Sequence, residues 1–135
     1  MEKRILTIPT ARRTQMIEIT HHVQELVSNQ KVTEGFCHLW VPHTTAAITV
    51  NENADPSVVS DMLETIDRLI PFEGGYRHSE GNSAAHIKST LVGCEKTIMI
   101  ESGRLQLGTW QGIYFCEFDG PRKRQVWLKI GGCVS

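Results

Sequence analysis

Hydrophobic and polar residues alternate along much of this chain, the period-2 pattern that predicts half-buried β-strands. One clear example is EGFCHLWVPH at residues 34–43, where Pro42 is expected to end regular pairing. The DGPR stretch at residues 119–122 is expected to be a hairpin turn between the last two strands. The segments expected to form strands are residues 2–10, 15–20, 34–43, 45–52, 96–102, 104–108, 111–118 and 124–130.

The strongest helical pattern lies between two prolines. Asp55 is a good N-cap, and Pro56 suits the first helical position. Pro71 is expected to end the helix, and residues 72–83 are rich in glycine and polar groups, which indicates a loop. The apolar stripe consists of Val58, Val59, Met62, Leu63, Ile66, Leu69 and Ile70.

Two shorter helices are also predicted. Residues 21–30 carry apolar side chains at helical spacing, and Thr20 is expected to cap them. Residues 84–92 form the other helix, with Ser83 as the expected cap and Gly93 at its end.

The order of these elements defines the expected fold class. Helices inserted among antiparallel strand candidates predict an α+β fold, with mixed, mainly antiparallel sheets and two or three helices. A chain of 135 residues and 15.2 kDa is the usual size of a single compact domain. Residues 131–135, GGCVS, are expected to be a frayed tail.

Composition narrows the possible partners. The 14 Lys and Arg residues nearly balance 15 Asp and Glu residues, so a dedicated nucleic-acid binder is not expected. The basic run Arg122–Arg124 is expected to be a solvated turn. No apolar run approaches the roughly 18 residues of a membrane-spanning helix. There is no signal-peptide pattern, and the four cysteines lack CxxC spacing, so free thiols and a cytoplasmic location are expected.

Several polar residues at junctions between elements are candidates for chemistry. His43 follows a strand directly, which suits a catalytic or metal-binding role but also a plain loop position. His86 and Lys88 open a helix, whose free N–H groups suit phosphate, although ordinary capping explains the pattern equally well. Trp110 and Gln111 lie between two glycines, which indicates either a ligand contact or a bulged strand with a core tryptophan. The candidate carboxylates are Glu52, Asp55 and Glu80. Two histidines with a carboxylate are a common set of metal ligands.

Three of these stretches together resemble one known family. HTTAAITVNENADPSV (residues 43–58), AHIKSTLVG (85–93) and GRLQLGTWQGIYFCEFDGPR (103–122) are similar to the motifs of the YjbQ family. The resemblance extends from about Gly35 to Ile130. It implies an α+β fold, a homotrimer and the activity of a secondary thiamine-phosphate synthase, which joins a pyrimidine-methyl diphosphate to a thiazole phosphate and releases pyrophosphate.

The resemblance also implies roles for individual residues. For catalysis these are His43, His86, Asn51 and Glu52; for phosphate binding, Lys88, Thr44 and Thr45; for substrate binding, Trp110 and Gln111; and for a divalent metal, Zn²⁺ or Mg²⁺, they are His43, His86, Asp55 and Glu80. Two alternatives stay open. One is a metal-dependent hydrolase or phosphatase, in which the metal activates water. The other is a trimeric, non-catalytic module that binds a small phosphorylated molecule.

Overall fold

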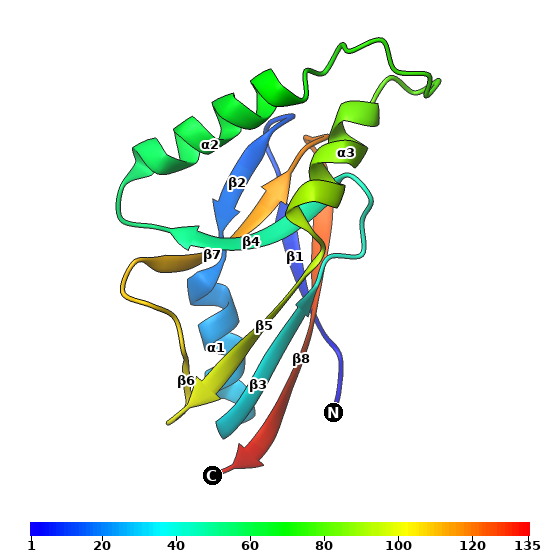
Figure 1. The fold of residues 1–135 in the computed structure, drawn as a ribbon. Coiled ribbons are helices and arrows are strands. Elements are labelled where there is room, and N and C mark those ends of the chain that lie inside the picture. Colours follow the sequence, from blue (N-terminus) through cyan, green and yellow to red (C-terminus); the bar gives the residue numbers. More distant parts are fainter.

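A computed structural model describes residues 1–135, and it contains three helices and eight strands (Figure 1). In chain order these are β1 (Arg4–Pro9), β2 (Gln15–Glu18), α1 (Thr20–Gln30), β3 (Val32–Trp40), β4 (Ala46–Glu52), α2 (Pro56–Leu69), α3 (Ser83–Val92), β5 (Glu95–Glu101), β6 (Arg104–Leu105), β7 (Gln111–Glu117) and β8 (Lys123–Val134). No helix is long and apolar enough to cross a membrane.

The strands form two antiparallel sheets. The larger has the order β1-β8-β3-β5-β6, and the smaller has the order β2-β7-β4. The main core lies between them and includes Leu39 and Leu128 from the larger sheet, Phe115 from the smaller one, and Val23 and Val27 from α1. This arrangement confirms the predicted α+β class and single compact domain.

A second, smaller core lies on the other face of the three-stranded sheet. There Ala85 of α3 packs with Ala47 of β4 and with Cys116 and Phe118 at the end of β7. The small side chains at Ala47 and Ala85 allow α3 to approach β4 closely. Helix α3 is thereby held directly over the start of β4, where several candidate site residues lie (Figure 1).

Helix α2 begins as predicted, because the Asp55 carboxylate accepts a hydrogen bond from the Ser57 backbone N–H at 2.9 Å and Pro56 is the first helical residue. The other two cap predictions are wrong. Helix α1 already includes Thr20, whose hydroxyl donates to Glu18 and accepts from the Ile113 N–H. Helix α3 likewise includes Ser83, so no Ser83 side chain caps it.

Two predictions near the C-terminus are also wrong. The DGPR segment does not close a hairpin, because β7 and β8 belong to different sheets and the segment carries the chain from one sheet to the other. Residues 131–135 are not a frayed tail, because β8 continues to Val134 and pairs with the start of β3. Gly131 lies opposite Phe36, and Gly132 lies opposite Gly35.

Candidate functional site

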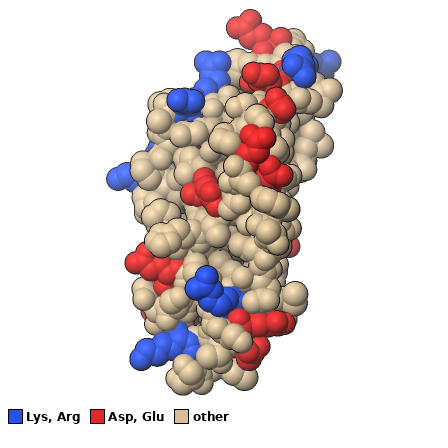
Figure 2. Space-filling model, turned by 90° about the vertical axis from the view of Figure 1, so that its left-hand side faces the viewer, with Lys and Arg blue, Asp and Glu red and all other residues tan.

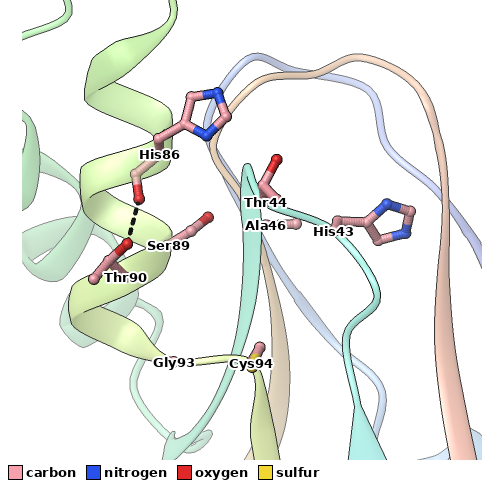
Figure 3. A pocket seen from close by; sticks show the side chains of 8 residues that line it. All are labelled: His43, Thr44, Ala46, His86, Ser89, Thr90, Gly93 and Cys94. Carbon is pink, nitrogen blue, oxygen red and sulfur yellow. Dashed lines mark hydrogen bonds between the residues drawn. The ribbon is translucent and has the colours of Figure 1, made fainter.

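A pocket of about 340 Å³ lies between the loop that follows β3 and the inner side of α3 (Figure 3). The loop contributes His43 and Thr44, and α3 contributes His86, Ser89 and Thr90. The remaining lining residues are Ala46, Gly93 and Cys94. The fold therefore brings together three predicted residues, His43, Thr44 and His86.

Hydrogen bonding fixes the imidazole of His43. Its Nε2 accepts a hydrogen bond from the backbone N–H of Gln125 at 2.9 Å, so the neutral ring carries its proton on Nδ1. Burial lowers the pKa of His43 below its ordinary value of 6.5, and the nearby charge of Arg124 lowers it further. Its ring is turned away from α3 (Figure 3). The lowered pKa favours the neutral form of His43, with its ring proton on Nδ1.

Helix α3 provides the opposite wall. The ring of His86 packs edge-to-face on His78, with ring centroids 5.5 Å apart. The Thr90 hydroxyl donates to the carbonyl oxygen of His86 at 2.9 Å. Since the Thr90 hydroxyl is occupied in this way, it presents mainly an acceptor oxygen to the pocket.

Ser89 is the least ordinary residue of the pocket. The residue is only 8% exposed, and its Oγ has no hydrogen-bond partner. A serine inside a helix ordinarily either faces solvent or bonds the carbonyl four residues earlier. Here the hydroxyl points toward the start of β4 instead (Figure 3). A buried hydroxyl without a partner costs about 1–3 kcal/mol, so this group is available to a ligand.

The ion pair between Arg124 and Glu117 supports the loop that follows β3. The Arg124 guanidinium bonds both carboxylate oxygens of Glu117, and it also donates to the carbonyl and hydroxyl oxygens of Thr45. Arg124, Glu117 and Thr45 are all buried. The prediction of a solvated turn is therefore wrong for Arg124, whereas Arg122 and Lys123 are exposed. The Thr45 hydroxyl is engaged in this network and does not line the pocket.

Lys88 lies beside the pocket and does not line it. Its ammonium is buried, donates to the Asp67 carboxylate of α2, and lies 5.9 Å from the centre of the Phe118 ring. Burial of a lysine requires such a partner. Lys88 thus links α3 to α2 in this structure, and the phosphate contact expected from the sequence stays a prediction.

The other predicted residues lie at the far end of β4. Asn51 and Glu52 close that strand, and Gln111 pairs with Glu52 at the start of β7. Seven residues of β4 separate the two ends, or about 20 Å at ~3.3 Å per residue. Trp110 is exposed at this end, and the Gln111 amide oxygen accepts from the Gly108 N–H. One chain therefore holds two separate groups of candidate residues.

The predicted metal ligands do not meet in one chain. Asp55 caps α2, and Glu80 is exposed in the loop before α3. No group of three or more His, Cys, Asp or Glu residues is placed to hold an ion. Within a single chain the donor set therefore does not fit the divalent metal that the resemblance implies.

Sequence reasoning missed Ser89, Thr90, Cys94 and the Arg124–Glu117 pair. The pair had a detectable signal, because Glu117 stands in the apolar run YFCEF, where a buried carboxylate needs a cation. Ser89 and Thr90 follow His86 by three and four residues, the spacing that places side chains on one side of a helix. Nothing in the local sequence indicated Cys94.

Comparisons with known proteins match nearly the whole chain. A family model described as "UPF0047 protein YjbQ-like" matches residues 4–133. UPF0047 protein YugU of Bacillus subtilis is 52% identical over 128 residues, which cover 94% of this chain and 97% of that protein. UPF0047 protein MJ1081 of Methanocaldococcus jannaschii is also 52% identical, over 93% of this chain and 91% of that protein.

Solved structures show the same fold. A YjbQ/UPF0047 protein from Clostridium acetobutylicum has a TM-score of 0.93 at 50% identity, with 95% of this chain and 99% of that chain covered. The hypothetical protein APE1520 of Aeropyrum pernix has a TM-score of 0.94 at 41% identity, with 98% and 100% covered. From the family match over residues 4–133 and these identities, the chain belongs to the YjbQ-like UPF0047 family.

Proposed function

We propose that the pocket binds the phosphate end of a small phosphorylated substrate and that the protein acts as a thiamine-phosphate synthase-like transferase. One observation carries the proposal: a buried, unpartnered Ser89 hydroxyl faces a pocket that also holds two histidines. The choice of the thiamine reaction comes from the resemblance of the motifs at residues 43–58, 85–93 and 103–122.

In this reaction the C–O bond between the pyrimidine-methyl carbon and the diphosphate breaks, and its electron pair leaves with pyrophosphate. The thiazole nitrogen then forms the new C–N bond to that carbon. A catalyst must stabilise negative charge on the departing oxygens. The Nδ1–H of His43 and the hydroxyls of Thr44 and Ser89 are the donors proposed for those oxygens, and His86 is the proposed proton donor.

The remaining groups are proposed to come from a neighbouring subunit. Asn51, Glu52, Trp110 and Gln111 lie about 20 Å from the pocket along β4, too far to act on the same small molecule in one chain. In a homotrimer, the far end of one chain would complete the pocket of the next. We propose a cytoplasmic location for this assembly.

The test is an assay with two substrates. Purified protein is incubated with pyrimidine-methyl diphosphate and thiazole phosphate, with and without Mg²⁺, Zn²⁺ or a chelator, and thiamine phosphate and pyrophosphate are measured. We expect product only when both substrates are present, and a loss of at least tenfold in His86→Ala and His43→Ala. His22→Ala, an exposed histidine on α1, is the matched control. Undiminished turnover in both pocket variants would refute the assignment.

One observation favours a second candidate, a non-catalytic binding module. The pocket lining contains no lysine, arginine or carboxylate. The nearby Lys88 is paired with Asp67 instead. A binding module would raise the melting temperature with ligand but give no turnover. Phosphate released from one substrate alone would instead indicate the hydrolase alternative.

A further inference from the structure

A second pocket, of about 430 Å³, lies between the start of α1 and the segment that joins β6 to β7. That segment runs beside α1 (Figure 1), and Gln24 of the helix ties the two together. Its amide oxygen accepts a hydrogen bond from the Leu105 N–H at 3.0 Å, and its amide nitrogen donates to the Gly103 carbonyl at 3.1 Å. The pocket shares no lining residue with the one between His43 and α3. It is therefore a separate feature, fixed by its own hydrogen bonds.

One wall of this second pocket carries a carboxylate that is held in place. The Oε2 atom of Glu18 accepts hydrogen bonds from the Thr20 hydroxyl and from the Asn53 side-chain amide, both at 2.9 Å. Glu18 nevertheless forms no ion pair within the chain. Burial raises the pKa of the Tyr114 hydroxyl above its ordinary value of 10, and the charges of Glu18 and Glu52 raise it further. The negative charge at this wall is thus oriented but not neutralised.

The opposite wall carries a cation that also lacks a partner. Arg104 of β6 lines the pocket and is exposed, and it forms no ion pair even with its cross-strand neighbour Glu101. His21 of α1 lines the same pocket and adds a ring nitrogen. The planar guanidinium of arginine binds carboxylates through two parallel hydrogen bonds. Glu18 and Arg104 therefore face one cavity with opposite charges and do not pair with each other.

Apolar side chains complete the lining. Leu105 is buried in the main core, and Leu107 packs against that core and is half-buried. Figure 2 shows the side of the molecule on which the segment from β6 to β7 lies, and its lower half carries both acidic and basic side chains. A ligand with charge of only one sign would meet like charge on this surface. The surroundings therefore favour a ligand that carries both signs of charge and an apolar part.

We propose that this second pocket binds a small zwitterion with an apolar body, the chemical class of the apolar amino acids. Glu18 binds the ammonium group, Arg104 and His21 bind the carboxylate, and the apolar side chain lies on Leu105 and Leu107. A ligand with a single charge leaves either Glu18 or Arg104 without a partner, so it binds more weakly. The reaction proposed above plays no part in this inference, because the two pockets have no residue in common.

The test is an NMR titration of isotope-labelled protein with L-leucine. We expect saturable shifts of the backbone amides of residues 20–24 and 103–107, which surround the pocket. Isoamylamine and isocaproate, which are leucine without its carboxylate and without its ammonium, are titrated in parallel. Each is expected to bind roughly tenfold or more weakly than leucine, because one charged contact is lost. No shift at these amides up to the solubility limit of leucine, or an analogue that binds as tightly as leucine, would overturn the proposal.

Two variants assign the two charges to their residues. Arg104→Gln is expected to weaken the binding of leucine and isocaproate but not of isoamylamine. Glu18→Gln, whose amide oxygen can still accept from Thr20 and Asn53, is expected to weaken leucine and isoamylamine but not isocaproate.

The matched controls are Arg77→Gln and Glu64→Gln, which change exposed charges outside the pocket and are expected to leave all three affinities unchanged. Circular dichroism and a thermal melt confirm that each variant is folded. If Arg104→Gln or Glu18→Gln weakened all three ligands equally, the charge assignment would be wrong, since the loss would come from the shape of the pocket.

Discussion

Replacing Glu117 by glutamine tests how the loop at the pocket is supported. Glu117 is completely buried, and its carboxylate accepts hydrogen bonds from Arg124, from the Asp119 N–H and from the Thr10 hydroxyl. Glutamine has nearly the same shape but no charge, so Arg124 would be left buried without a counter-ion. Breaking such a pair by removing one partner costs about 3–5 kcal/mol.

This cost is large enough to measure in two ways. For a chain of this size it corresponds to a fall of roughly 10–20 °C in melting temperature. Urea unfolding at pH 7, followed by circular dichroism, gives the same free energy from the shift in midpoint. A control with both partners replaced, Glu117→Leu with Arg124→Met, is expected to be more stable than Glu117→Gln alone. A loss below about 1 kcal/mol in Glu117→Gln, or a double variant no more stable than the single one, would refute the reasoning.

The same carboxylate makes stability depend on pH. Burial alone would raise the pKa of Glu117, but the hydrogen bonds from Arg124, Asp119 and Thr10 outweigh burial and lower the pKa below its ordinary 4.5. A lowered pKa in the folded state gives stability that is fully present above pH 4.5 and is lost as the pH falls through the folded value. Wild type is therefore expected to lose stability below pH 4.5 more steeply than Glu117→Gln. Parallel pH profiles would contradict this.

Three other predictions concern the pocket and its supports. Ser89→Ala is expected to stabilise the free protein by about 1 kcal/mol in urea unfolding, because it removes an unpartnered hydroxyl, and yet to weaken ligand binding; a destabilised variant would mean that the hydroxyl has a partner. Asp67→Asn is expected to be more destabilising than Lys88→Met in thermal melts, because it leaves the Lys88 ammonium buried without its carboxylate; the reverse order would contradict the observed pairing. The pKa of His43, measured by NMR, is expected to lie below 6.5, and Arg124→Met is expected to raise it. As the pH falls below 6.5, this histidine is protonated in the unfolded chain before it is protonated in the folded chain, so the free energy of unfolding should decrease.

Local patterns were sufficient for most of the elements. The alternation at residues 34–43 correctly predicted the strand β3, and the Asp55–Pro56 pair correctly predicted where α2 begins. The errors at the C-terminus have a common physical cause. Whether residues 131–135 fray depends on pairing with the start of β3, about a hundred residues earlier, and no local pattern records that pairing.

The candidate site, too, was predicted from local patterns only in part. His43, Thr44 and His86 stand at polar junctions beside regular elements, and the structure brings them to one pocket. Ser89 was missed because a serine within a helix is unremarkable until its neighbours are known. Arg124 was missed because a short basic run after a turn usually faces water, and its contact with Thr45 spans 79 positions of sequence.

A crystal structure with bound pyrophosphate would show whether the pocket binds phosphate. We expect pyrophosphate between the loop at His43 and helix α3, with the Ser89 Oγ about 3 Å from a phosphate oxygen. Loss of that density in crystals of Ser89→Ala grown under the same conditions would separate a specific site from an adventitious ion. Pyrophosphate bound elsewhere, with the pocket empty and the Ser89 hydroxyl still unpartnered, would contradict a phosphate-binding role for this pocket.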